Sequence, residues 1–271
     1  MNNSMSELWS RLGFLAIALV VYRIGTHIPI PGINPEQVAA LFQQSQGTIL
    51  QYFNLFSGGA LERMSIFALS VVPYISSAIV MQLFSNSVPY LQELKKDGQA
   101  GRNKITQYTR YGTVIFALIQ SSALTVTLQT AGLIDAGSIF SAFVAVISIV
   151  TGTMFLMWLG EQISERGIGN GISIIIATSI ITGVPRAFGQ ALEQTQQGDL
   201  NYLLLIVLAV LTLLVVAFVV FVENAQRKIT VNYAQRNQVR GMIQAPSSFL
   251  PLKLNMSGVI PAIFASTFLL F

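Results

Sequence analysis

Long apolar runs follow one another along the chain, separated by short polar segments. One run, residues 12–30, carries Arg23 and His27, and another, residues 66–84, contains Pro73. The remaining runs hold no charged residue and cover residues 111–134, 136–160, 167–185, 200–222 and 254–271. Each run is close to the roughly 20 residues that a helix needs to cross a bilayer. The pattern predicts six complete membrane-spanning helices and the beginning of a seventh.

The composition agrees with a membrane protein. Of the 271 residues, 53% are hydrophobic and 10% are charged, which is too little polar surface to cover a soluble globule. The absence of cysteine excludes disulfides and thiolate metal sites, and a single histidine excludes a histidine-rich metal cluster. The first apolar run lacks a small-residue cleavage site and is followed by many others, so we expect an anchor and not a signal peptide.

Basic residues gather in two of the polar segments. They are Lys95, Lys96, Arg102, Lys104 and Arg110 between the second and third runs, and Arg227, Lys228, Arg236, Arg240 and Lys253 between the sixth and seventh. By the positive-inside rule both segments face the cytoplasm, and the even number of spans between them agrees. We therefore expect one membrane domain over residues 1–271, a cytoplasmic amino terminus, and cytoplasmic loops at 91–110 and 223–256.

Residues 48–61 interrupt the apolar pattern. The segment is uncharged but rich in Gln, Asn, Ser and Gly, and it is too short to cross before Glu62 and Arg63. Irregular backbone at membrane depth is tolerated only where protein buries it or where it lines a watery cavity. The residues alone leave two alternatives open, a re-entrant segment or an amphipathic loop on the outer surface.

Several long motifs carry a family resemblance. The stretches "YRIGTHIPIPGIN", "FNLFSGGALERMSIFALSVVPYISSAIVMQLF", "GTMFLMWLGEQISERGIGNGISIII", "VENAQRKITVNYAQR" and "LPLKLNMSGVIPAIFAS" closely resemble bacterial SecY, the family of channel subunits of protein translocons. The resemblance covers nearly the whole chain. It implies an all-α polytopic membrane protein, a helical bundle that comprises the first five-helix half and the start of the second. Because SecY proteins have ten spans, we expect the amino-terminal part of a longer protein.

The resemblance gives the interrupted segment a role. In SecY proteins a short re-entrant half-helix, the plug, closes the resting pore from its outer side. It corresponds here to residues 48–67, with Phe56, Gly58, Gly59, Glu62 and Arg63 as its candidate residues. Glycines permit a sharp bend, and the two charges favour a hydrated cavity over lipid. Arg23 is interpreted as a side chain that snorkels or pairs toward this outer funnel.

A peptide channel needs an apolar constriction that can dewet and has no binding site of its own. The pairs Val71 with Ile75 and Ile172 with Ile176 each stand four residues apart and share a helix face. On this spacing alone ordinary core packing is the favoured interpretation. The resemblance instead implies that these residues form the pore ring with Ile263, and Val71 stands where relatives often have Ile.

The resemblance also implies a lateral gate and a docking loop. Ser76, Gln120 and Thr267 match a polar cluster at the seam through which apolar segments leave the channel, although Ser and Thr could equally bond their own helix carbonyls. The docking residues implied are Arg227, Lys228, Arg236 and Arg240, with a topology determinant as the alternative. Gly241 stands where relatives can have a second arginine.

The implied function is that of a passive protein-conducting channel of the bacterial cytoplasmic membrane. Its implied partners are SecE and SecG counterparts, the SecA motor ATPase, the ribosome, translocating polypeptides and the lipid bilayer, and it needs no cofactor. A secondary transporter with broken helices is the alternative. The lack of ionisable residues in spans three to six weighs against it. An intramembrane enzyme is disfavoured because no nucleophile with a base stands out.

Overall fold

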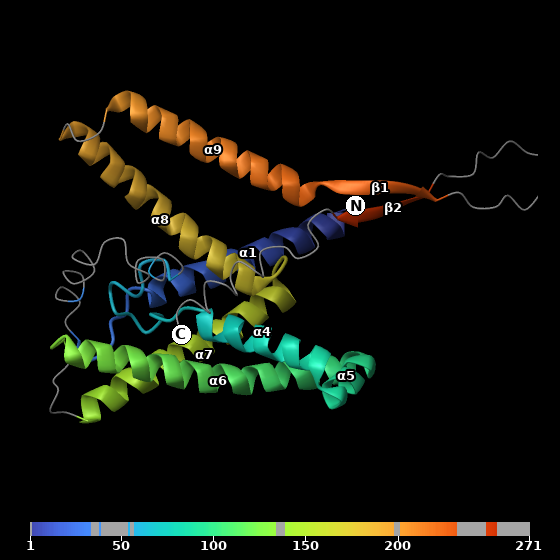
Figure 1. Ribbon diagram of the computed structural model, residues 1–271, viewed down its shortest axis with the longest axis horizontal. Helices are drawn as coiled ribbons and strands as arrows, with labels where there is room; N and C mark the ends of the chain where they lie inside the picture. The colour runs from blue at the N-terminus through green and yellow to red at the C-terminus, as the bar shows by residue number, and fades with distance from the viewer. Residues whose placement is uncertain are drawn as a thin grey trace, which may run out of the picture. The chain divides into compact units, whose positions relative to one another are not determined.

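The computed structural model describes residues 2–33, 38, 54, 57–133, 139–197, 201–231 and 248–253. The fold is mostly helical, with elements α1 (Asn2–Gly25), α4 (Val72–Ser87), α5 (Pro89–Lys96), α6 (Gly98–Thr130), α7 (Ile139–Arg166), α8 (Gly171–Gln196), α9 (Tyr202–Asn224), β1 (Gln226–Val231) and β2 (Ser248–Lys253) (Figure 1). Five of these helices are long and apolar enough to cross a membrane, namely α1 from Met5 onward, α6, α7, α8 and α9. The expected polytopic helical protein is confirmed.

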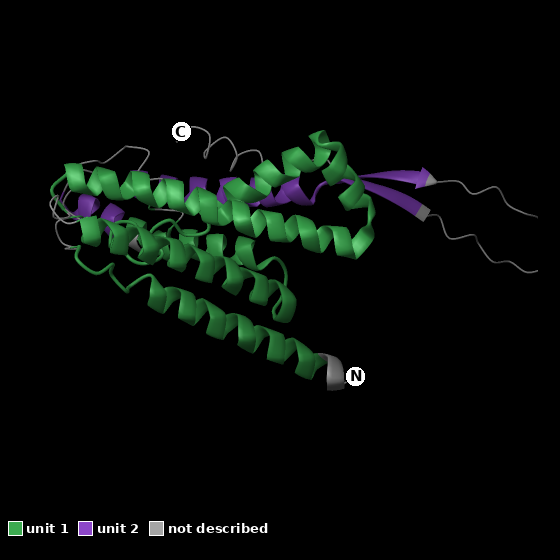
Figure 2. Cartoon of the chain, turned by 90° about the horizontal axis from the view of Figure 1, so that it is seen from below, with its two compact units in different colours: residues 1–188, 270–271 green, residues 189–269 purple. Residues whose placement is uncertain are grey.

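The chain divides into two compact units, and the division falls after Phe188, inside α8 (Figure 2). In the first unit, α6 packs against α4, α5 and α7, and α1 packs against α7. The second unit contains the end of α8, α9 and the two strands. The candidate site described below lies within the first unit.

The second predicted span begins later than its apolar run. Residues 57–71 form consecutive turns, and the helix α4 begins at Val72. Pro73 therefore lies in the first helical turn, where its missing N–H breaks no hydrogen bond of the helix. The expected plug half-helix is not found over residues 57–71, and residues 48–53, 55 and 56 lie outside the described part of the chain.

Other helices extend beyond the predicted apolar runs. The segment expected as a cytoplasmic loop at 91–110 is helical, because it contains the end of α5 and the first turns of α6. Likewise α8 continues past Pro185 and ends at Gln196. The apolar runs thus located the centres of these helices correctly. The helices continue beyond the runs through polar and basic residues.

Two apolar clusters form the core of the first unit. One gathers Ile30, Ile33, Val38, Leu61, Met64, Ala68, Leu128, Ala145 and Ile149. The second, called here the ring cluster, has Ala18, Tyr22, Ala60, Phe67, Val71, Leu156, Leu159, Ile163 and Ile175 at its centre, with Ile66, Ile75, Ile172 and Ile176 among the partly buried side chains packed on it. Residues of the interrupted segment contribute to both clusters.

A two-stranded antiparallel sheet lies within the segment expected as the loop 223–256. Lys228 pairs with Pro251 and Ile229 pairs with Leu250. The sequence reading did not predict these strands, although residues 228–231 alternate polar and apolar side chains as a strand does. The structure therefore adds a hairpin to the expected all-α fold.

Candidate functional site

The interrupted segment folds around its glycine pair. Gly58 and Gly59 have φ values of +65° and +81°, in the left-handed region that a glycine enters without strain. Asn54 closes the turn, because its Oδ1 accepts from the backbone N–H of Glu62 and its Nδ2 donates to the Glu62 carboxylate, both at 3.0 Å. A side chain at Gly58 would bring a Cβ to 3.2 Å from the Cα of Ser179. The pair thus supplies both the bend and a close approach to α8.

This segment lies inside the first unit. Ser57, Ala60, Leu61 and Met64 are all buried, and Ala60 is fully inaccessible. Residues 57–64 are therefore packed against the rest of the first unit, which irregular backbone at membrane depth requires. The predicted plug residues Gly58, Gly59, Glu62 and Arg63 all lie in this segment, whereas Phe56 lies outside the described residues.

A buried hydroxyl joins the segment to two helices. The Tyr22 hydroxyl of α1 lies 2.5 Å from Ser179 Oγ of α8 and 3.4 Å from the Ser57 carbonyl oxygen. The Tyr22 ring stacks on Phe67, with ring centroids 6.2 Å apart, and Phe67 stacks in turn on Phe155 of α7. Sequence reasoning did not identify Tyr22, since a tyrosine within an apolar span carries no distinctive pattern.

Charged side chains at the end of α1 also hold the segment. Arg23 Nη1 donates to the Gly58 carbonyl at 3.3 Å. Arg63 Nη1 lies 2.6 Å from His27 Nε2, and His27 Nδ1 lies 2.9 Å from the Arg23 carbonyl oxygen. Because a guanidinium nitrogen can only donate, His27 Nε2 is the acceptor and Nδ1 carries the proton.

Backbone pairing fixes the far end of the segment. The N–H of Ile30 donates to the Met64 carbonyl oxygen at 2.9 Å, and the N–H of Ile66 donates to the Ile28 carbonyl oxygen at 3.0 Å. These bonds enclose an isolated antiparallel bridge between Pro29 and Ser65. The chain following α1 is thus tied to the chain preceding α4.

Four of the residues predicted for the pore ring lie in one apolar cluster. Val71 is buried at the centre of the ring cluster, and Ile75, Ile172 and Ile176 pack on it partly exposed. Ala60, from the glycine-hinged segment, belongs to the same cluster. The fifth predicted member, Ile263, lies outside the described residues.

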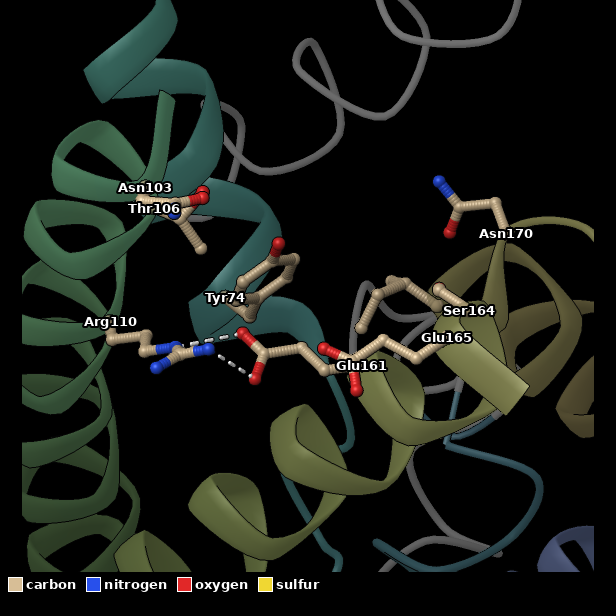
Figure 3. Close-up of a pocket in the computed structure, with 9 residues that line it drawn as sticks. Tyr74, Asn103, Thr106, Arg110, Glu161, Ser164, Glu165 and Asn170 are labelled. Atoms are coloured by element: carbon tan, nitrogen blue, oxygen red, sulfur yellow. Dashed lines mark hydrogen bonds and ion pairs between the residues drawn. The ribbon is translucent and has the colours of Figure 1, made fainter. Parts of the chain in front are cut away.

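A polar cavity of about 410 Å³ borders this cluster through Ile172. Figure 3 labels the other residues that line it. Arg110 of α6 reaches across to Glu161 of α7, with Nε 2.9 Å from Oε1 and Nη2 2.8 Å from Oε2. Such a two-point contact fixes orientation as well as charge. Sequence reasoning missed this ion pair, although opposite charges at the facing ends of consecutive antiparallel spans were a usable signal.

The predicted lateral-gate residues are not bridged to one another in the described part of the chain. Ser76 Oγ donates to the Val72 carbonyl of its own helix at 3.2 Å, which is the alternative that sequence reasoning left open. Gln120 Oε1 is buried and has no hydrogen-bond partner in the structure. Thr267 lies outside the described residues.

Two of the predicted docking residues lie on the hairpin. Arg227 and Lys228 are exposed on β1, and Lys228 Nζ lies 5.9 Å from the centroid of the Phe249 ring on β2. Arg236 and Arg240 lie outside the described residues. The hairpin thus presents basic side chains beside exposed apolar ones such as Phe249 and Leu250.

Comparison with known proteins gives a consistent result. The SecY family model matches residues 65–271. The protein translocase subunit SecY of Pseudomonas aeruginosa is 57% identical over 270 residues, and that of Escherichia coli strain K12 is 55% identical over 271 residues. These matches cover 100% and 98% of this chain. The chain spans 61% of the length of each of these relatives.

A solved structure shares the fold. A chain described under the heading "The plug domain of the SecY protein stablizes the closed state of the translocation channel and maintains a membrane seal" matches with a TM-score of 0.67 at 20% identity. The match covers 97% of this chain and 56% of the other. The arrangement of helices is therefore that of a known channel protein.

Proposed function

Because the chain belongs to the SecY family, we propose that it acts in a channel that conducts unfolded polypeptides across the bacterial cytoplasmic membrane and releases apolar segments sideways into the lipid. The chain has no chemical step of its own in this proposal and is not an enzyme. The energy for transport comes from partners.

The observation that carries the proposal is the composition of the ring cluster. Val71, Ile75, Ile172 and Ile176 come from α4, its N-cap and α8, yet they share one apolar cluster with Ala60 of the hinged segment. A narrow collar of aliphatic side chains resists ions because water leaves it easily, and it accepts a chain of any sequence because it offers no specific contact. We assign Ile263 to the same ring.

Residues 54–67 are the plug of this channel. The support is the burial of Ser57, Ala60, Leu61 and Met64, with Ala60 in the ring cluster. Side-chain hydrogen bonds also anchor the segment: Asn54 to Glu62, Tyr22 to Ser57 and Arg23 to Gly58. The hydrogen bond of Tyr22 is neutral and worth about 0.5–1.5 kcal/mol net, whereas those of the Arg23 guanidinium and the Glu62 carboxylate involve a charge and are worth about 1.5–3 kcal/mol each. A plug held by such contacts keeps the channel closed at rest and can still be displaced by an entering polypeptide.

We assign the lateral gate to Ser76, Gln120 and Thr267. Gln120 supports this assignment best, because its buried carbonyl oxygen lacks a partner in the described part of the chain. A hydrogen bond across a membrane seam is worth about 0.6 kcal/mol on average, which is weak enough for the seam to open.

The hairpin is the docking element, with its amino-terminal strand and the loop beyond it carrying Arg227, Lys228, Arg236 and Arg240. Its partners are the ribosome, whose RNA phosphates suit exposed bases, and the SecA motor ATPase. SecE and SecG counterparts complete the channel. The amino terminus faces the cytoplasm, in keeping with the basic residues of α5 and the start of α6.

The test is deletion of residues 54–67 in the complete protein assembled in a membrane. We expect a steady ion conductance that the unmutated channel lacks. Ile75→Asn should likewise raise conductance and admit precursors with defective signal sequences. Leu83→Asn is the matched control, because it also replaces an aliphatic side chain of α4 with Asn, but at an exposed position. Unchanged conductance after the deletion, or equal effects of the two Asn variants, would overturn the proposal.

A further inference from the structure

The polar cavity beside the ring cluster has a location suited to an entering polypeptide. It opens between α4, α6, α7 and the start of α8, and Ile172 belongs to both its lining and the ring cluster (Figure 3). A chain that approaches the ring from this side passes through the cavity first.

The cavity faces the cytoplasmic end of the helices. Asn103 and Thr106 line it from the first turns of α6, the part of the helix that also carries Arg102 and Lys104. The positive-inside rule places this basic end in the cytoplasm. In the proposed function this is the side from which polypeptides enter.

The charges that line the cavity do not cancel. Arg110 contributes one positive charge, and Glu161 and Glu165 contribute two negative charges, so the net charge is −1. Arg110 is held by both oxygens of Glu161, at 2.8 and 2.9 Å. Among the residues that the structure describes, the Glu165 carboxylate makes no hydrogen bond or ion pair. The cavity thus offers an exposed carboxylate that interacts electrostatically with Arg110 but forms no ion pair among the described residues.

An aromatic side chain lies in the same cavity. Tyr74 projects into it from the first turn of α4, next to the ring residue Ile75. A Lys or Arg side chain can place its charged group over a tyrosine ring while its methylene stem lies on apolar surface. Ile172 supplies apolar surface at the same edge of the cavity.

We propose that Glu165 and Tyr74 form a subsite for a cationic group of the entering polypeptide, a Lys or Arg side chain or the free amino terminus. The subsite rests on the proposed function, because it names the part of the substrate that this channel recognises before the ring. The subsite binds basic residues of the polypeptide before they reach the pore ring. The ring itself makes no sequence-specific contact.

The expected effect is small but specific. An ion pair at a partly exposed site changes a binding equilibrium about 1.5- to 5-fold. The test uses the complete protein in membrane vesicles with its motor, and two precursors that differ only in whether the first residues carry lysines or glutamines. Glu165→Gln should slow transport of the lysine precursor by that factor and leave the glutamine precursor unchanged. Glu165→Lys should slow the lysine precursor further.

Glu93→Gln is the matched control, because Glu93 is an exposed carboxylate on α5 that does not line the cavity. Equal slowing of both precursors by Glu165→Gln would show a structural role only, and unchanged transport of the lysine precursor would show no role. Either result overturns the subsite. If the unmutated protein moves neither precursor, the proposed function itself fails, which is a distinguishable outcome.

Discussion

Replacing Ser179 with alanine should destabilise the protein more than replacing Tyr22 with phenylalanine, although each change removes the hydrogen bond between them. Ser179 Oγ donates to the Ile175 carbonyl at 2.8 Å. Each hydroxyl has a single hydrogen, so either Ser179 gives up its 2.8 Å bond to Ile175 or Tyr22 gives up its 3.4 Å bond to the Ser57 carbonyl. The longer bond is the weaker one, so we assign the tyrosine hydrogen to the 2.5 Å contact. Ser179 is therefore the acceptor, and the two substitutions leave different groups behind.

The magnitudes follow from that assignment. Tyr22→Phe removes the donor and leaves Ser179 bonded to Ile175, so it costs one hydrogen bond, about 0.5–1.5 kcal/mol. Ser179→Ala leaves a buried tyrosine hydroxyl with only the longer 3.4 Å contact to Ser57. Because that contact is long, the tyrosine hydroxyl is poorly satisfied, and the cost approaches the about 1–3 kcal/mol of a buried donor without an acceptor. The double variant has no tyrosine hydroxyl left to satisfy. Its loss of unfolding free energy should therefore be about 1 kcal/mol smaller than the sum of the two single losses.

The measurement is the free energy of unfolding of the complete protein, purified in detergent micelles and titrated with denaturant. The three variants and the unmutated protein form a double-mutant cycle, which isolates the coupling between the two side chains. Strictly additive costs, or a larger cost for Tyr22→Phe than for Ser179→Ala, would refute the assigned direction of the hydrogen bond.

Two further predictions concern the same region. Gly152→Ala should lower the unfolding free energy by about 1–3 kcal/mol, because the new Cβ would lie 1.9 Å from the Ile66 carbonyl oxygen. Gly13→Ala is the control and should not lower it, because no atom lies within 4 Å of the new Cβ. Equal thermal midpoints for the two variants would contradict this packing. His27→Lys should raise ion leak through the complete channel, because it sets a second cation against Arg63 at a site where the imidazole accepts a hydrogen bond. His27→Gln keeps a hydrogen-bond acceptor and should leave the ion conductance low. Equal ion leak in the two variants would show that the contact between His27 and Arg63 does not contribute to the seal.

Apolar runs located the centres of the spans well but not their ends. Hydropathy reports which residues prefer lipid, while a helix continues for as long as its backbone hydrogen bonds can be made. The first turns of α6 carry Arg102 and Lys104, so they are helical without being apolar. The start of α4 is the opposite case, since residues 66–71 are apolar except for Ser70 and yet form turns.

The candidate site was only partly predictable. Spacing and family motifs indicated Val71, Ile75, Ile172 and Ile176, which the structure places in one cluster. The role of Tyr22 could not be inferred, because its partners Ser57 and Ser179 lie far away in sequence. Tertiary contacts of this kind leave no local periodicity in the sequence.

The bridge between Pro29 and Ser65 has a mechanical consequence. In the proposed channel the bridge anchors the end of the plug segment that leads into α4, so we expect residues 57–64 to be able to move while the helix that carries Ile75 keeps its position. A stretch of about eight residues reaches at most about 27 Å from its anchor, which is close to the thickness of the hydrocarbon layer. We therefore expect the bridge to limit how far the plug segment can move from its closed position.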